Sequence, residues 1–384
     1  MDRETERIPS FLDRLRDAKV ELAFIADPDS VFYFSGFWGY LGMDWDRATM
    51  LALARDHEPI LITPAMEAEM GRNMSGINDV REWIDGEAGE WPAHVQAITT
   101  KIRPRRIGVD TYKTHPRILE VIRQVAPEAE IVDIATIVGA MRMIKTPHEI
   151  ATMRQAGQVA VAMVEAGRGA LAEGVPEYEV ALAIIAGGTR KAAEFLNQDQ
   201  VRSLFSPTIY NLGIMQSGRD MCMVHRRSTV KKVESGDPVY FCFCGIANFK
   251  QFKLGFDRTF FVKSADKEMA RAQETAVRAQ KAAVDMVRAG AVAEDVHFAA
   301  EEVYRSAGHG LAYRTGRGIG YSFLEEPQLK RGNKAKLQAG MTIVIDGGVT
   351  IAGRGGGRVG DSLVVNETGF EFLTPYPREL AVLR

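Results

Sequence analysis

Short apolar runs alternate with amphipathic or turn-rich segments at the start of the chain. Runs of this kind, bounded by Asp, Pro and Gly, predict buried strands. The predicted strands are Val20–Ala26, Met50–Ala54, Pro59–Ile62, Arg106–Val109 and Ile131–Ile134. The segment Pro116–Val125 lies between two of these runs and predicts a helix. This alternation predicts a compact α/β domain with a largely parallel sheet over residues 1–140.

Longer amphipathic segments follow from residue 141 onward. A long helix is expected to start near His148, because Thr146 and Pro147 suit a helix N-terminus. Two further helices are predicted, over Glu177–Phe195 and Lys267–Val287. Strands are predicted over Ser203–Ile209, Pro238–Gly245, Arg258–Val262, Thr342–Ile345 and Ser362–Val365. Residues 141–384 are therefore expected to form an α+β domain, with Gly353–Gly357 as a hairpin connection.

Composition and charge restrict the possible functions. The 384 residues include 48 Lys and Arg against 50 Asp and Glu, and this even balance gives no reason to expect nucleic-acid binding. No apolar run approaches the roughly 18 residues of a membrane helix, and the charged start MDRETERIPSFLDRLRD is not typical of a signal peptide. The three cysteines, Cys222, Cys242 and Cys244, suit a reducing compartment. We therefore expect a cytoplasmic two-domain enzyme without a nucleic-acid or membrane partner.

Two local patterns are too weak to decide the function. Gly316–Gly320 has the glycines of a dinucleotide-binding loop, but no strand–turn–helix unit surrounds it. Cys242 and Cys244 alternate along an aromatic strand, so they share a face and are interpreted as buried core residues rather than metal ligands or nucleophiles.

The order of the motifs in the second half is more informative than any single motif. In sequence they are Gln216–Arg219 with His225, Gly255–Phe260, Gly316–Gly320, Leu324–Pro327, Ala339–Asp346 and Gly357–Asp361. In this order and spacing the chain resembles the creatinase/aminopeptidase P family, and Met141–Pro147 is similar to that family's interdomain junction. The resemblance implies an α/β N-terminal domain over residues 1–140 and an α+β pita-bread domain over residues 141–384.

The chain departs from the family at the metal-binding positions. Metallopeptidases of this family bind two metal ions through two Asp, one His and two Glu. The corresponding positions here lie near Phe243 and at Asp257, Arg317, Asp346 and Gly360, with Asp361 adjacent. A guanidinium has no lone pair for a metal, and its fixed positive charge repels a cation. We therefore expect neither a metal ion nor any other cofactor.

The family also includes creatinase, which is metal-free, and the resemblance to it implies roles for three types of residue. His225 matches the catalytic histidine and would be the general acid and base. Asp257 and Asp346 would complete the catalytic set by orienting the substrate and Arg317, whose planar fork can bond carboxylates.

Further residues are expected to bind the substrate. Arg47, shortly after Trp45, matches a creatinase arginine that binds a substrate carboxylate from the neighbouring subunit, which predicts a homodimer. Leu324 replaces a histidine of the peptidases and makes its face apolar, while Asp361 lies beside the lost ligand position. Arg317 would repel a free guanidinium, so an acidic or neutral small molecule is expected.

The sequence therefore predicts a metal-independent, creatinase-like hydrolase of a non-peptide C–N bond in a small carboxylated metabolite. Two alternatives remain open. One is a lyase or decarboxylase on the same scaffold, and the other is a relative of the Xaa-Pro peptidases that has lost catalysis and only binds a ligand.

Overall fold

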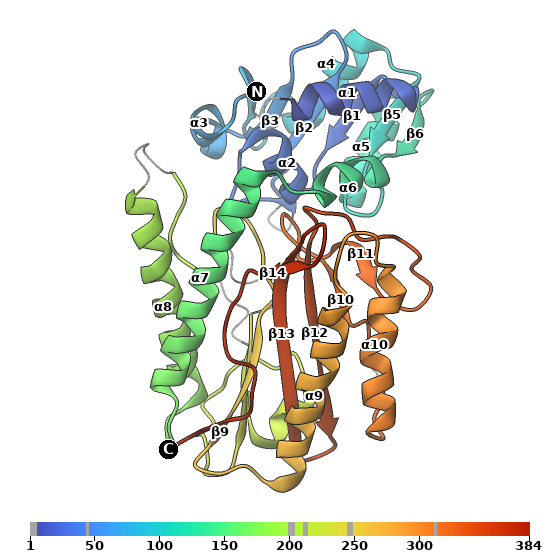
Figure 1. Ribbon diagram of the computed structural model, residues 1–384. Coiled ribbons are helices and arrows are strands. Elements are labelled where there is room, and N and C mark those ends of the chain that lie inside the picture. Colours follow the sequence, from blue (N-terminus) through green and yellow to red (C-terminus); the bar gives the residue numbers. More distant parts are fainter. Residues whose placement is uncertain (1–5, 44–45, 199–203, 210–213, 244–248, 311–312) are drawn as a thin grey trace. The chain divides into compact units, whose positions relative to one another are not determined.

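The chain forms two compact units, each built on one sheet. The computed structural model describes residues 6–43, 46–198, 204–209, 214–243, 249–310 and 313–384 (Figure 1). The two units are Met1–Arg142 and Met143–Arg384, whereas the sequence predicted a division between residues 140 and 141. Within the described ranges, no helix is both long enough and apolar enough to cross a membrane.

The first unit is an α/β domain with the sheet order β4-β3-β2-β1-β5-β6. Its strands are β1 (Leu22–Ile25), β2 (Met50–Ala54), β3 (Ile60–Pro64), β4 (Asp79–Trp83), β5 (Arg106–Val109) and β6 (Glu130–Asp133). Its helices are α1 (Arg7–Asp17), α2 (Pro28–Ser35), α3 (Ala65–Met74), α4 (Glu90–Ile102), α5 (Pro116–Val125) and α6 (Ala135–Met143). The five predicted strands and the helix α5 are therefore confirmed.

The sheet of the first unit is mixed rather than largely parallel. Strand β2 pairs antiparallel with both β1 and β3, whereas the other three pairings are parallel. The connection of residues 55–59 is too short for a parallel crossover, so β2 and β3 form a hairpin. Strand β4 was not predicted, because its sequence DVREW is mostly polar and only Trp83 is buried.

The second unit has the sheet order β11-β10-β12-β13-β9-β8-β7, and β14 and β15 pair with β13 and β9. Its strands are β7 (Ile214–Ser217), β8 (Pro238–Cys242), β9 (Asp257–Val262), β10 (Gly316–Gly318), β11 (Glu325–Leu329), β12 (Thr342–Ile351), β13 (Gly355–Val365), β14 (Phe370–Phe372) and β15 (Ala381–Leu383). Its helices are α7 (Pro147–Ala170), α8 (Glu177–Gln198), the 3₁₀ helix η2 (Gly218–Cys222), α9 (Lys267–Asp285) and α10 (Ala293–Ser306).

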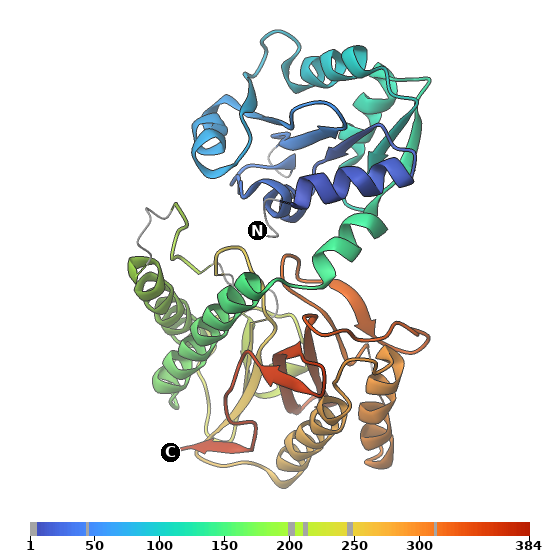
Figure 2. The same cartoon turned by 45° about the horizontal axis from the view of Figure 1, so that its top comes forward.

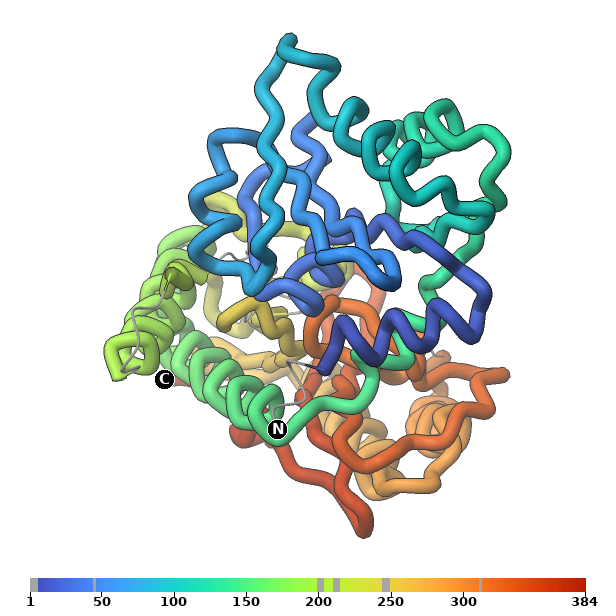
Figure 3. Tube along the Cα trace, turned by 90° about the horizontal axis from the view of Figure 1, so that it is seen from above, coloured from blue at the N-terminus to red at the C-terminus, as the bar shows by residue number. Residues whose placement is uncertain are grey.

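Long helices cover one face of the second sheet. Helices α7 and α8 run side by side (Figures 1, 2 and 3). Helix α9 lies along β12 and β13, with α10 beside it (Figures 1 and 2). A Cβ atom at Gly357 on β13 would lie 2.3 Å from the Cα atom of Gln273 on α9, so only glycine allows this close approach. On α7, Gly167 similarly lies against the ring of Phe241 on β8. Gly357 and Phe241 therefore mark the helix-covered face of the sheet.

The main difference from the predicted strands lies before β7. A strand was predicted over Ser203–Ile209, but residues 204–209 contain none, and Pro207 lacks the N–H group that a central strand requires. Residue 203 lies outside the described residues. Strands β12 and β13 extend much further toward their connecting turn than predicted, so the Gly353–Gly357 segment contains the hairpin turn and the first residues of β13.

Candidate active site

Four residues on adjacent strands of the second sheet form a row, which we call the carboxylate row. Cys242 on β8 pairs with Asp257 on β9, Asp257 pairs with Gly360 on β13, and Gly360 pairs with Asp346 on β12. Directly opposed residues of neighbouring strands have their side chains on the same face. Cys242 directly follows Phe241 on β8, and the ring of Phe241 lies against α7. Successive side chains of a strand point to opposite faces, so the row lies on the face opposite the helices.

The glycine in the row leaves space for its neighbours. A Cβ atom at Gly360 would lie 2.8 Å from the Oδ2 atom of Asp257 and 2.9 Å from the Cβ atom of Asp346. Distances below 3.0 Å are not tolerated between such atoms, so the carboxylate of Asp257 fills the space that a side chain would need. The two aspartates therefore approach each other across Gly360.

Arg317 on β10 contributes a fixed positive charge to this face. It pairs with Val344, two residues before Asp346 on β12, so its side chain lies on the same side of the sheet as the row. Its Nη1 atom donates a hydrogen bond of 2.7 Å to Oδ2 of Asp346, and its Nε atom donates to the carbonyl of Phe323 at 3.0 Å. The two charged side chains are only 3% and 8% exposed, so this is a buried ion pair.

The side chains of the row do not suit a divalent metal ion. The part of the chain that the structure describes contains no group of three or more His, Cys, Asp or Glu residues that could bind a metal. Catalytic metal sites usually need at least three such ligands. The guanidinium of Arg317 cannot donate a lone pair, and it already binds one of the two carboxylates. The described residues of the row therefore do not supply the donor set on which the metal chemistry of the peptidases depends.

The cysteine in the row was not recognised from the sequence. The sequence placed the lost first ligand near Phe243, but the strand register brings Cys242 opposite Asp257. Cys242 is buried, in agreement with its predicted place in the core, and packs with Tyr240 and Met221. The other cysteine of the pattern, at position 244, lies outside the described residues.

Asp361 does not belong to the carboxylate row. It follows Gly360 on β13, and its side chain therefore points to the helix-covered face. It accepts hydrogen bonds from Arg258 at 2.8 Å, from Arg378 at 2.7 Å and from Gln280 of α9 at 2.9 Å. These bonds fasten α9 and the C-terminal segment to the sheet. The predicted substrate-binding role of Asp361 is therefore corrected to a structural one on the helix-covered face.

His225 lies on a turn that is tied to the same face as the row. Gln216 on β7 pairs with Tyr240, which lies two residues before the cysteine of the row, so both side chains share its face. The Nε2 atom of Gln216 donates hydrogen bonds to the carbonyl oxygens of Met223 at 2.7 Å and Arg226 at 2.6 Å. These two bonds flank His225, whose side chain is exposed.

A buried glutamate holds the other side of this turn. Glu177 at the start of α8 is fully buried and accepts hydrogen bonds from Arg226, Ser217 and the backbone of Thr229. Burial alone would raise the pKa of Glu177, but these hydrogen bonds outweigh it and leave the pKa below its ordinary value. Glu177 therefore remains ionised and fixes the segment that carries His225.

None of the remaining predicted substrate-binding residues belongs to the row. Arg47 belongs to the first unit, where its Nη1 atom lies 2.9 Å from Asp85 and its guanidinium lies over the ring of Trp83. Trp45 lies outside the described residues. Leu324 is 41% exposed in the loop between β10 and β11. Arg358 on β13 was not predicted as a site residue, although its spacing of two from Gly360 places it on the face of the row.

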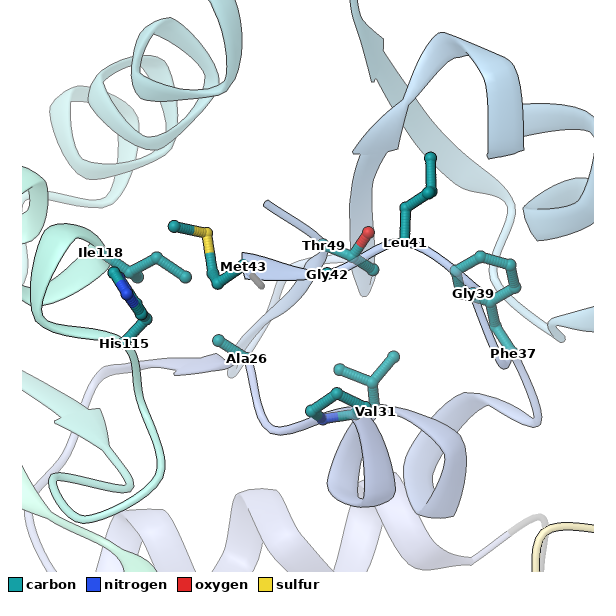
Figure 4. A pocket seen from close by; sticks show the side chains of 11 residues that line it. Ala26, Val31, Phe37, Gly39, Leu41, Gly42, Met43, Thr49, His115 and Ile118 are labelled. Carbon is teal, nitrogen blue, oxygen red and sulfur yellow. The ribbon is translucent and has the colours of Figure 1, made fainter. Parts of the chain in front are cut away.

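The first unit contains a separate cavity of about 170 Å³ (Figure 4). Its wall is mostly apolar, with Val31, Phe37 and Met43 among the lining residues. The side chains of Thr49 and His115 also line it, and the His115 ring accepts a hydrogen bond from the backbone at the start of α5. This cavity lacks the paired carboxylates and cations of the row, so the row remains the better candidate for catalysis.

Comparisons with known proteins match both units. Residues 151–367 match the family described as "Metallopeptidase family M24", and residues 7–144 match "Creatinase/Prolidase N-terminal domain". The chain is 28% identical to an agropine synthesis cyclase of Rhizobium rhizogenes over 94% of this chain and 93% of that protein. It is 26% identical to an Xaa-Pro dipeptidase of Lactobacillus helveticus over 96% of both.

Solved structures confirm the predicted fold class. A recombinant prolidase from Thermococcus sibiricus superimposes with a TM-score of 0.86 at 23% identity, over the full length of both chains. The X-Pro aminopeptidase from Thermotoga maritima gives a TM-score of 0.83 at 19% identity, over 98% of this chain and 99% of the other. At these identities the likeness establishes the fold: an α/β N-terminal unit and a pita-bread C-terminal unit.

Proposed function

The chain belongs to metallopeptidase family M24, and we propose that it is a metal-independent hydrolase of a non-peptide C–N bond in a small carboxylated molecule. The observation that carries this proposal is the ion pair in the carboxylate row. The Nη1 atom of Arg317 lies 2.7 Å from Oδ2 of Asp346, beside a glycine at position 360. This arrangement puts a permanent cation beside the carboxylates on which a metal ion would depend.

The remaining groups can supply acid–base chemistry. His225 would take a proton from a water molecule, whose oxygen then bonds to the substrate carbon. The C–N bond breaks, and the protonated imidazole returns the proton to the leaving nitrogen. Asp257 would orient the substrate, while Arg317 holds Asp346 in place and disfavours a cationic substrate.

The relatives support a hydrolase in general and do not point to one substrate. Several are named as dipeptidases or as Xaa-Pro dipeptidases. The relative from Rhizobium rhizogenes is named as a synthesis cyclase, although it matches nearly the whole chain. The same two-domain architecture is therefore compatible with reactions other than peptide cleavage.

The metal requirement provides the direct test. We expect the purified chain to contain less than one transition-metal ion per molecule, and its turnover to be unaffected by a chelator, because the row lacks a third ligand. The substrate panel should contain carboxylated amidines, amides and ureido acids, with Xaa-Pro dipeptides as the comparison class. Elemental analysis would give the metal content, and turnover would be measured with and without chelator.

Three results would contradict the proposal. The first is a chain that binds two stoichiometric metal ions and loses its turnover on chelation. The second is a product that contains no oxygen from ¹⁸O-labelled water, which would identify a lyase or a decarboxylase instead of a hydrolase. The third is cleavage of Xaa-Pro dipeptides alone, which would restrict the chain to peptide bonds.

We further propose that the chain works as a homodimer in which Arg47 contacts a carboxylate bound to the partner subunit. Symmetric dimers are the commonest oligomers, and the salt bridge with Asp85 holds the Arg47 fork in one orientation. Light scattering should give twice the mass of one chain, and Arg47→Ala should raise KM far more than it lowers kcat. A fully active monomer at micromolar concentration would contradict this prediction.

A further inference from the structure

Arg358 extends across the face that carries the carboxylate row. It lies on β13 opposite Gly348 of β12, and a Cβ atom at Gly348 would lie 2.4 Å from its Cγ atom. The arginine side chain therefore runs closely over the backbone of β12. Its Nη2 atom donates to Oγ1 of Thr350 at 2.7 Å, and its Nη1 atom donates to the hydroxyl of Tyr313 at 3.0 Å.

The surroundings of Arg358 differ from those of the other buried arginines. The nitrogen atoms of Arg142, Arg258 and Arg317 each lie 3.5 Å or less from a carboxylate oxygen. Arg358 is equally buried, with 4% of its surface exposed, but no described carboxylate lies within 4.0 Å of its nitrogen atoms. Buried charges are costly unless they are paired. Arg358 is thus a buried cation whose hydrogen-bond acceptors in the described chain are two hydroxyl groups.

Arg358 also remains charged in this environment. Burial alone would lower the pKa of Arg358, but the electrostatic effects of Tyr313, Tyr240, Asp257 and Cys242 outweigh it. The pKa of Arg358 is therefore above its ordinary value. The Tyr240 ring contributes a cation–π contact, with its centroid 5.6 Å from the guanidinium carbon. Because Tyr240 lies two residues before Cys242 on β8, its side chain shares the face of the row, and the contact places the guanidinium on that face.

We propose that Arg358 binds a carboxylate group of the ligand beside Asp257 and Asp346. This assignment rests on the proposed function and deepens it, because it places an anion-binding group within the second unit. A planar guanidinium can donate two parallel hydrogen bonds to a carboxylate. The hydroxyl groups of Tyr313 and Thr350, which now accept from Arg358, would yield these donors to the ligand.

The experiment compares propionate with propionamide, which has the same shape but no charge. Binding to the full-length purified chain is measured by calorimetry at constant ionic strength. We expect propionate to bind and propionamide to fail, and Arg358→Gln to raise the Kd for propionate by roughly 10-fold to 100-fold. The matched control is Arg354→Gln, which removes the same charge from the exposed end of this hairpin, where Arg354 pairs with Glu268 and Asp266.

Two additional variants keep the test decisive if Arg358→Gln does not fold. Arg358→Lys retains the charge without the fork and should still weaken propionate binding. Tyr313→Phe removes a competing acceptor and should bind propionate at least as tightly as the original chain. Three outcomes would overturn the assignment. They are an unchanged Kd for propionate in both Arg358 variants, an equal loss of propionate affinity in Arg354→Gln, and no propionate binding to the original chain.

This test does not depend on turnover. Loss of propionate binding in the Arg358 variants, together with chelator-sensitive turnover, would preserve the anion-binding role and reject the metal-independent hydrolase. Metal-independent turnover, together with propionate binding that is unchanged in the Arg358 variants, would preserve the metal-independent hydrolase and reject the anion-binding role of Arg358.

Discussion

His225→Ala is expected to lower kcat by roughly 10²–10⁴-fold, because general acid–base catalysis typically contributes this much. A reaction without a metal ion needs a protein group to activate water, and His225 lies on a turn tied to the face of the carboxylate row. The hydrogen bonds that fix this turn come from Gln216 and Arg226 rather than from the imidazole. The variant should therefore fold normally. The measurement is kcat on the substrate that the panel identifies, with folding checked by circular dichroism.

The matched control is His148→Ala. His148 is also exposed in the second unit, but it lies at the start of α7 and should leave kcat unchanged. If His225→Ala loses less than about tenfold in kcat, another group must transfer the proton, and Asp257 would be examined next. An equal loss in both variants would indicate a general effect on folding or assembly.

Asp346→Asn is expected to lower the free energy of unfolding by about 3–5 kcal/mol. The reason is that Arg317 would keep its charge in a buried position after losing its carboxylate partner, and both side chains are almost fully buried. Urea denaturation of the original chain and the variant gives the difference directly. The double variant Arg317→Met/Asp346→Leu should recover much of this loss, since it removes both charges together.

A surface pair gives the control for this experiment. Lys281 and Asp285 form an ion pair on α9 with 72% and 56% of their side chains exposed, so Asp285→Asn should hardly change stability. A small effect of Asp346→Asn, similar to that of the control, would show that the Arg317–Asp346 pair is weakly coupled. A double variant less stable than Asp346→Asn would show that the charges themselves are required.

Three of the strands that were predicted correctly, β1, β2 and β3, are buried at every position. Strand β1, with the sequence LAFI, is buried at every position and is visible as a continuous apolar run. The first half of β13 has the sequence GGGRVG and shows no such run. Two of its glycines leave space for side chains or backbone from distant parts of the sequence: Gly357 for Gln273 of α9, and Gly360 for Asp257. Local patterns therefore could not show where β13 begins.

The candidate site could be predicted only in part for a related reason. The order of the motifs was sufficient to associate Asp257 with Asp346, and the structure places both in one row. Asp361 was included wrongly because one position along a strand reverses the face. Which of Gly360 and Asp361 faces the row depends on the pairing of β13 with β9, a contact between distant parts of the sequence. Arg358 was missed for the same reason.

The carboxylate row also makes activity a late event in folding. Its positions come from β8, β9, β12 and β13, so the row exists only after segments far apart in the sequence have paired. Pairings over such long separations are slow, whereas helices form early from local contacts. During refolding, the helical signal of α7 and α9 should therefore return before turnover does. The delay between them measures the time needed to close the central part of the sheet.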